Sequence, residues 1–229
     1  MNYNKPICII PARSGSKRIK NKNIILINKK PLIAHTIRIL KKTNIFSRII
    51  VTTDSEKIKK ISISEGAEVP FLRKNKLSGS KVTIQKTIQD CIKRLNSGNI
   101  KYHFCVFPTA ILIEPNDLIS AYNIIKKGNF NSVVAVTENK TFFRSFIKKK
   151  KIINFFWSKN SKKMSQELKS AYSDSGTFYI FKTSNYIKNN KILPSNSSVY
   201  LIDKYKGVNV DDQNDLKFLK IAFNMKRKK

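Results

Sequence analysis

The chain has 229 residues, and its 46 lysines and arginines against 14 aspartates and glutamates give a formal net charge of +32. A hydrophobic fraction of 41% supports a packed core and argues against a disordered chain, and the length fits a single domain over residues 1–229. No apolar run reaches the ~20 residues of a membrane span, and the first run stops at Pro11, so we expect neither a signal peptide nor membrane association.

The charge first suggests a nucleic-acid partner. Lysine outnumbers arginine 38 to 8, however, and the chain is also rich in isoleucine and asparagine, which share A/T-rich codons with lysine. Dedicated nucleic-acid binders favour arginine for bidentate and stacked contacts, and they cluster it. We therefore ascribe most of the charge to coding bias and expect no specific nucleic-acid partner. A basic nucleic-acid-binding protein is kept as the alternative from a different functional class.

The three cysteines, Cys8, Cys91 and Cys105, are odd in number and widely spaced within apolar patterns. They fit neither a disulfide framework nor a zinc site, and they favour a reducing, cytoplasmic location. Cys105 lies within an apolar run, so we expect a small buried side chain rather than a nucleophile.

Apolar runs and helical patterns alternate through the first 137 residues. Short, continuous apolar runs are typical of strands that are buried on both faces, and the patterns between them have helical periodicity. This alternation predicts a three-layer α/β fold with a mainly parallel sheet. The expected strands are 7–10, 48–53, 102–107 and 132–137, the expected helices are 31–42, 55–65, 83–95 and 115–127, and 68–72 is a short extended piece.

The alternation stops after Thr137. Residues 138–172 are polar, rich in lysine and dotted with aromatic residues, so we expect an arm, lid or dimerisation excursion from the main sheet. Strands at 174–181 and 198–202 and a last helix at 215–225 then complete the predicted domain.

The loop after the first strand, PARSGSKRIKNKN at 11–23, combines small residues with several cations. In open α/β sheets ligands bind at the carboxyl ends of strands, and backbone N–H groups freed by small residues can hold phosphate oxygens. Arg13, Lys17 and Lys22 can neutralise a polyphosphate. The loop matches neither GxxxxGK[ST] nor GxGxxG, and taken alone it is better explained as a basic surface turn.

The whole string resembles the signature PARGGSKxxxxKN of the acylneuraminate cytidylyltransferases. Two further stretches follow in the order found in that family: IIVTTDSEKI at 49–58, and GAEVPFLRKNKLS at 66–78, which carries Arg73. The stretch FFWSKNSKKMSQELKSAYSDSGTFYIF at 155–181 resembles the pseudaminic acid branch in particular, as does the Thr109-Ala110 pair. The resemblance covers nearly the whole chain.

The chain departs from the family at its metal motif. Where the family has Asp-x-Asp, this sequence has Asn209-Val210-Asp211, so one carboxylate is replaced by an amide, and Asp212 follows as an extra acid. We therefore predict a weaker Mg²⁺ site than is usual in the family.

The resemblance implies a Rossmann-like nucleotidyltransferase (glycosyltransferase-A-like) fold, a homodimer, and Mg²⁺-dependent transfer of CMP from CTP to the anomeric hydroxyl of a nine-carbon acidic sugar. Pseudaminic acid is the expected sugar, and the product would serve glycosylation of flagellin or surface polysaccharide. N-acetylneuraminate and legionaminate are the alternative sugars. A degenerate homologue that binds nucleotide without turnover is a third alternative, motivated by Asn209.

The resemblance also assigns site residues by the positions that match. The catalytic set is Arg13, Lys17, Lys22 and Asp211, and the metal set is Asp211 and Asn209. The residues expected to bind CTP are Ala12, Arg13, Ser14, Gly15, Ser16, Lys17, Asn23 and Arg73, and those expected to bind the sugar are Thr109, Gln166, Tyr172, Asp174, Phe178 and Tyr179. Strand alternation places either Phe178 or Tyr179 in the core.

Other polar residues are expected to have structural roles. Asp54, Asp117 and Asp215 fit helix N-caps or first turns. His35 lies in a predicted helix and His103 at a strand start, without a second histidine at metal-ligand spacing, so we expect packed or surface side chains.

Overall fold

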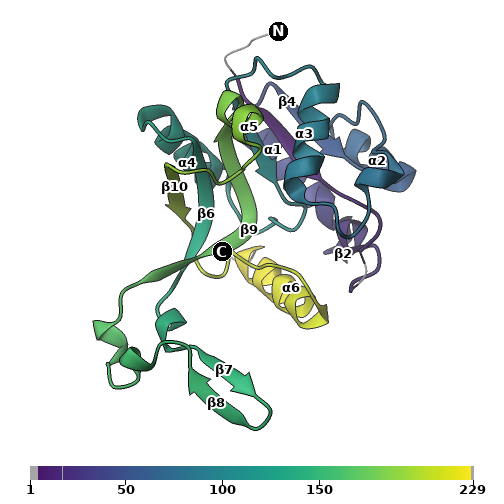
Figure 1. Ribbon diagram of the computed structural model, residues 1–229. Coiled ribbons are helices and arrows are strands. Elements are labelled where there is room, and N and C mark those ends of the chain that lie inside the picture. The colour runs from purple at the N-terminus through teal and green to yellow at the C-terminus, as the bar shows by residue number, and fades with distance from the viewer. Residues whose placement is uncertain (1–4, 17, 228–229) are drawn as a thin grey trace.

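The computed structural model describes residues 5–16 and 18–227 and is built around one six-stranded sheet. The strand order is β10-β6-β9-β5-β1-β4 (Figure 1). β1 pairs in parallel with β4 and β5, β10 pairs in parallel with β6, and within this sheet only β9 runs against its neighbours. The predicted mainly parallel α/β fold is confirmed. The strands are β1 (Ile7–Pro11), β4 (Arg48–Thr52), β5 (Tyr102–Val106), β6 (Ser132–Asn139), β9 (Ala171–Lys182) and β10 (Ser197–Leu201).

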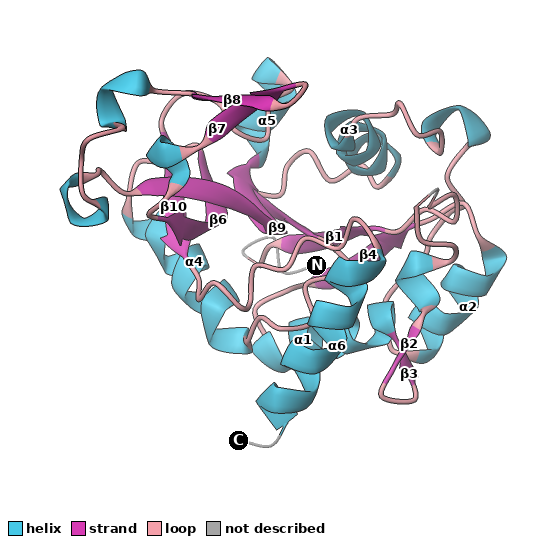
Figure 2. Ribbon diagram, turned by 90° about the horizontal axis from the view of Figure 1, so that it is seen from below, coloured by secondary structure: helices cyan, strands magenta, loops and turns pink. Residues whose placement is uncertain are grey.

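Helices cover both faces of the sheet, as Figure 2 shows. α1 (Leu32–Thr43), α2 (Glu56–Ser64) and α4 (Pro115–Lys127) pack on one face, where Ile37, Ile58 and Leu118 join its buried core. α3 (Ile84–Arg94) and α5 (Thr183–Asn189) cover the other face. α6 (Gln213–Arg227) packs through Leu216 and Leu219 on a third cluster, which contains Val208 and Val210. The sequence patterns predicted all of these helices except α5.

The predicted excursion begins as an extension of two core strands. The ends of β6 and β9 pair beyond the sheet, with Glu138 opposite Tyr172 and Asn139 opposite Ala171. They carry a separate hairpin of β7 (Phe146–Lys149) and β8 (Ile152–Phe155), which projects from the body at the lower left of Figure 1. A second small hairpin, β2 (Leu26–Ile27) and β3 (Lys30–Pro31), precedes α1.

β9 is irregular in its middle. Val134 of β6 pairs with Tyr179 and Val136 with Asp174, so four residues of β9 face a single residue of β6. Gly176 lies within this bulge at φ +62°, a left-handed conformation that favours glycine. Bulges of this kind re-aim side chains and are common beside active sites.

The helix N-termini confirm two of the three predicted capping aspartates. Asp117 accepts a hydrogen bond from the N–H of Glu114 at 2.7 Å, and Asp215 accepts from the N–H of Asp212 at 2.9 Å. The prediction for Asp54 was wrong: Ser55 caps α2, because its Oγ accepts from the N–H of Ile58. Asp54 instead binds the loop after β1, as described below.

His103 is fully buried, with one ring nitrogen 2.7 Å from the Thr183 hydroxyl and the other 3.1 Å from that of Ser97. Burial lowers the pKa of His103 from its ordinary value near 6.5 to about 3. The unfolded chain therefore takes up a proton below pH 6.5 that the folded chain refuses, so stability is complete above this value and falls as the pH is lowered towards 3.

We expect this histidine to lower the free energy of unfolding by about 2 kcal/mol between about pH 7.5 and about pH 5. Urea unfolding of the wild type and of His103→Asn at both pH values isolates the effect, since all other acid-sensitive groups are shared. The variant should lose less stability on acidification by that amount. Equal losses in the two proteins would contradict the assignment.

Candidate active site

A pocket of about 470 Å³ opens at the carboxyl ends of β1 and β5, beside the bulge of β9. It brings together residues that are far apart in the sequence: the loop after β1, Arg73, the end of β5, the β9 bulge and Asn209. Its position agrees with the strand-end location expected for ligands of this fold. The lining residues are Pro11, Arg13, Ser16, Lys22, Asn23, Arg73, Ser80, Val82, Ile84, Thr87, Phe107, Pro108, Thr109, Asp174, Gly176, Tyr179 and Asn209.

The loop after β1 is held in place by two polar contacts. The buried Asn23 amide donates to the carbonyl of Arg13 at 2.9 Å. The Asp54 carboxylate, at the end of β4, accepts from the N–H of Ser14 at 2.7 Å and from its hydroxyl at 2.8 Å. These contacts fix the backbone at Arg13, which lines the pocket.

Three other residues predicted to bind CTP have side chains that do not face the pocket or positions outside its lining. The side chain of Ala12 is fully buried in the core, and its N–H donates to Thr52, so its side chain is not available to a ligand. Ser14 and Gly15 are exposed and do not line the pocket. Lys17 lies outside the described residues.

Lys22 connects the loop to the segment that carries the predicted metal residues. Its half-buried ammonium group donates to the carbonyl of Val210 at 2.7 Å. Burial lowers the pKa of Lys22, and the neighbouring Asp211 carboxylate acts in the opposite direction. A poorly solvated cation at a pocket wall interacts strongly with an anionic ligand, since little water competes for it.

Arg73 forms another cationic wall of the pocket. Its side chain is only 6% exposed, and its guanidinium donates to the hydroxyl and the carbonyl of Thr52. Burial lowers the pKa of Arg73, while Asp54 raises it. The contacts with Thr52 fix the plane of the guanidinium, which leaves a rigid set of donors beside the pocket.

Another part of the lining combines an acid with hydroxyl groups. Asp174 accepts from the N–H of Gly176 at 2.9 Å and from the hydroxyl of Tyr179, and Thr109 lies nearby in the same lining. Burial, followed by the bond to Asp174, raises the pKa of Tyr179, so its phenol stays protonated and serves as a donor. This wall can bind hydroxyl or amide groups of a polar substrate.

Three predicted sugar-binding residues lie away from the pocket. Phe178 is fully buried in the sheet core, and strand alternation brings Tyr179 to the pocket instead. Gln166 is exposed on the arm, and Tyr172, 54% exposed, lies where β9 leaves the sheet. Within this chain, neither Gln166 nor Tyr172 lines the pocket.

Sequence reasoning missed the wall formed by residues 80–87, which includes Ser80, Val82 and Thr87. These residues are neutral and belong to the approach and first turn of α3, so no charge or motif marks them in the sequence. Phe107, which packs edge-on against Tyr179, is also part of the lining.

The residues predicted to hold Mg²⁺ lie side by side, and of the two Asn209 lines the pocket whereas Asp211 is outside its lining. The Asn209 amide donates to Oδ2 of Asp211 at 3.2 Å, and Arg18 pairs with Oδ1 at 2.7 Å. In the part of the chain that the structure describes, no group of three or more histidine, cysteine or acidic side chains is placed to hold a metal by itself. Mg²⁺ commonly uses one or two carboxylates together with substrate phosphates and water, so one carboxylate and one amide oxygen fit an ion that binds together with a triphosphate.

The sheet and its strand-end pocket with cationic walls are features of a nucleotidyltransferase. The chain belongs to the cytidylyltransferase family, because the family model described as "Cytidylyltransferase" matches residues 7–220. The family predicted from the sequence is thus confirmed.

Named relatives cover nearly the full length. The chain is 34% identical over 225 residues to the pseudaminic acid cytidylyltransferase of Campylobacter jejuni (strain 81-176), covering 96% of this chain and 97% of the relative. It is 27% identical to a CMP-N,N'-diacetyllegionaminic acid synthase of Campylobacter jejuni, covering 96% and 95%. A solved CMP:2-keto-3-deoxy-manno-octonic acid synthetase complexed with CTP has the same fold, with a TM-score of 0.74, 14% identity and 99% and 100% of the two chains covered.

Proposed function

We propose that this enzyme transfers CMP from CTP to pseudaminic acid, releasing pyrophosphate. The observation that carries the proposal is that one pocket is lined both by three cations, Arg13, Lys22 and Arg73, and by the polar pair Asp174 and Tyr179. The first suits a triphosphate and the second a polyhydroxylated sugar. The similarity to a pseudaminic acid cytidylyltransferase supports this sugar over other nine-carbon acids.

In the proposed reaction, the anomeric oxygen of the sugar forms a bond to the α-phosphorus of CTP, and the bond from that phosphorus to the bridging oxygen breaks. Arg13 and Lys22 neutralise the charge that develops on the departing pyrophosphate. Asp174, the acid that lines the pocket, accepts the hydroxyl proton. We place Lys17 with this cationic group on sequence grounds.

Mg²⁺ would be held by Asp211 and Asn209 together with phosphate oxygens, and when bound it would supply charge neutralisation. Arg18, which pairs with Asp211 and is 67% exposed, would have to release that carboxylate first. The cost of breaking an exposed ion pair is small, on the order of 1 kcal/mol or less.

Pyrophosphate release with CTP, Mg²⁺ and a panel of nine-carbon acidic sugars tests the proposal. We expect release with pseudaminic acid and much weaker release with N-acetylneuraminate and N,N'-diacetyllegionaminate. Release with either of these but not with pseudaminic acid would refute the sugar assignment. Absence of release with every sugar would favour a homologue that binds nucleotide without turnover.

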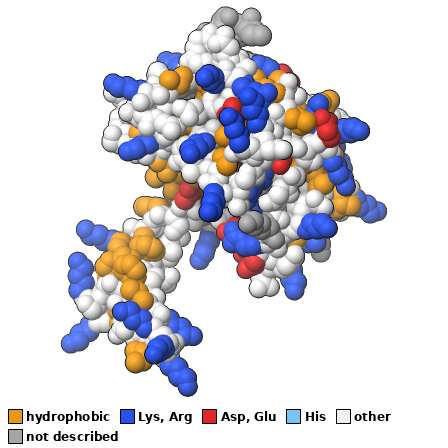
Figure 3. Space-filling model, turned by 45° about the vertical axis from the view of Figure 1, so that its right-hand side comes forward, with side chains coloured by type: hydrophobic (Ala, Val, Ile, Leu, Met, Phe, Trp, Pro, Cys, Tyr) orange, Lys and Arg blue, Asp and Glu red, His pale blue; other side chains and the backbone are white. Residues whose placement is uncertain are grey.

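We also propose that the arm, residues 138–172, binds a second copy of the chain. Its hairpin exposes large apolar side chains, including Phe146, Ile147, Ile152 and Ile153, which are between 42% and 67% exposed. Figure 3 shows hydrophobic side chains gathered on this arm. Apolar surface concentrated on a thin projection is typical of an interface, because water is a poor solvent for it.

Sedimentation equilibrium tests the dimer, which should have about twice the mass of the 26.4 kDa chain. Ile153→Asp should shift the equilibrium towards the monomer. Ile63→Asp on α2 is the matched control, since Ile63 is similarly exposed at 52% but lies away from the arm. A monomeric wild type, or the same shift in both variants, would contradict the proposal.

A cytoplasmic location is also proposed. The three cysteines are free and buried, and burial raises the pKa of each thiol. Unpaired thiols are usual in a reducing compartment. Among the described residues, no helix has the length and apolar character needed to cross a bilayer.

A further inference from the structure

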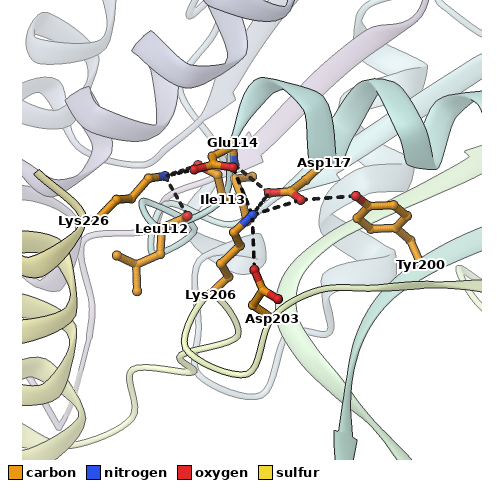
Figure 4. Close-up of polar contacts among 8 residues, drawn as sticks. All are labelled: Leu112, Ile113, Glu114, Asp117, Tyr200, Asp203, Lys206 and Lys226. Carbon is orange, nitrogen blue, oxygen red and sulfur yellow. Dashed lines mark hydrogen bonds and ion pairs between the residues drawn. The ribbon is translucent and has the colours of Figure 1, made fainter. Parts of the chain in front are cut away.

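A buried lysine lies at the centre of an ion cluster outside the pocket (Figure 4). Lys206 is 7% exposed, and its ammonium group lies 3.0 Å and 3.2 Å from the two carboxylate oxygens of Asp117. It also lies 3.1 Å from Glu114 and 3.7 Å from Asp203. Three of the 14 acidic residues of this strongly basic chain therefore surround one lysine.

The cluster extends to the last helix. The ammonium group of Lys226, near the end of α6, donates to the carbonyls of Leu112 and Ile113 at 2.8 Å and 3.0 Å and lies 3.7 Å from Glu114 (Figure 4). The start of α4 is thus joined by charged contacts to the segment after β10 and to the end of α6, although the contacting residues are 92 and 114 positions apart in the chain.

The ion pairs hold Lys206 in its charged form. Burial by itself lowers the pKa of Lys206, but hydrogen bonds with Asp117 and Glu114 outweigh it and raise the pKa overall. The same contact lowers the pKa of Glu114. A buried pair of this kind is weak evidence for added stability, because desolvation offsets much of the attraction. The contacts of Lys206 support a geometric role better than a stabilising one, because they fix the segment after β10 against the start of α4.

The segment held by Lys206 leads directly to the rim of the active site. Gly207 packs so closely on the sheet that an added Cβ would lie 2.5 Å from the side chain of Thr137. Asn209 and Asp211 follow within five residues and alternate with the buried side chains of Val208 and Val210. The start of α6 comes shortly after them. The far end of this stretch is fixed by the capping contacts of Asp215.

The partners of Lys206 follow a different segment of the pocket lining. Glu114 and Asp117 follow closely after Thr109, which lines the pocket, and the residues between, Ile111 to Ile113, are buried. The ion cluster therefore sets the spacing between the chain that leaves β5 and the chain that carries Asn209 and Asp211.

We propose that Lys206 is a positioning residue that holds Asn209 and Asp211 in place for a divalent cation bound together with CTP. The proposal rests on the proposed function, but only on its nucleotide-binding step. Groups that orient metal ligands from behind commonly change metal affinity by about 10–100-fold when they are removed.

The test measures Mn²⁺ binding to the CTP complex by electron paramagnetic resonance, without sugar and therefore without turnover. Lys206→Met leaves a buried acid without a partner and can prevent folding, so Lys206→Met/Asp117→Asn, which removes both charges of the closest pair, is the main variant. Lys204→Met is the matched control, because Lys204 is exposed and makes none of these contacts.

We expect the double variant to bind Mn²⁺ about tenfold or more weakly, with its affinity for metal-free CTP unchanged and the control identical to wild type. An unaltered Mn²⁺ affinity in a variant with a lowered unfolding temperature would assign the cluster to stability alone and overturn the proposal. A wild type whose CTP complex binds no Mn²⁺ would overturn it as well. Failure of every sugar in the pyrophosphate assay would refute the proposed function without affecting this measurement.

Discussion

Replacing Lys22 with alanine is expected to lower kcat about 10²–10³-fold, the usual effect of removing a single preorganised group that stabilises developing charge. Lys22 is half-buried, lines the pocket and contacts the carbonyl of Val210, so its ammonium group is held in place before a ligand binds, where we propose that the phosphates of CTP lie. Because a fixed cation acts mainly on the charge of the leaving pyrophosphate, kcat should fall more than the apparent affinity for CTP.

Lys20→Ala is the matched control for this experiment. Lys20 is exposed, lies two residues away in the same loop and is absent from the pocket lining. We expect it to retain wild-type steady-state constants. Equal losses in the two variants would indicate a general effect of loop charge, and unchanged turnover in Lys22→Ala would remove this lysine from the mechanism.

Replacing Asn209 with aspartate is expected to lower the Mg²⁺ concentration for half-maximal activity about tenfold, equivalent to about 1.4 kcal/mol. The substitution adds a second carboxylate beside that of Asp211. The Asn209 amide nitrogen that it replaces lies 3.2 Å from Asp211 Oδ2 and donates a hydrogen bond to it. Without metal, two carboxylates at this distance repel each other, so the metal-free variant should also unfold at a lower temperature than wild type. Mg²⁺ with CTP should reverse that loss.

The charge control for Asn209→Asp is Asn224→Asp, an exposed position on α6. It changes the net charge by the same amount and is expected to leave the Mg²⁺ dependence unaltered. If wild type and Asn209→Asp reach half-saturation at the same Mg²⁺ concentration, the prediction of a weakened metal site is wrong.

Local sequence patterns predicted most of the sheet and its helices, because buried parallel strands and amphipathic helices have distinct periodicities. α5 was missed because its seven residues are too short for a periodic pattern to appear. The direction of β9 was also not predicted, since an antiparallel strand between parallel neighbours depends on the path of the arm.

The site was predicted where chemistry is local and missed where it depends on tertiary contacts. Arg13, Lys22 and Arg73 lie in recognisable strings, and all three line the pocket. Asp54 has the position of a helix cap in the sequence. In the structure β1 and β4 pair in parallel, so the residues that follow them lie side by side, and Ser14 reaches the Asp54 carboxylate. Lys206 is one of 38 lysines, and nothing in the sequence distinguishes it from those on the surface.

Gly176 and Asn209 occupy adjoining space, since a Cβ at Gly176 would lie 3.3 Å from the Asn209 amide. Any larger residue at position 176 must displace the side chain at 209, and the left-handed backbone there is a further obstacle. Asparagine and aspartate, by contrast, have the same size and shape. An aspartate can therefore occupy position 209 by one isosteric exchange without repacking, whereas a side chain at position 176 would need both a strained left-handed backbone and a shift of residue 209.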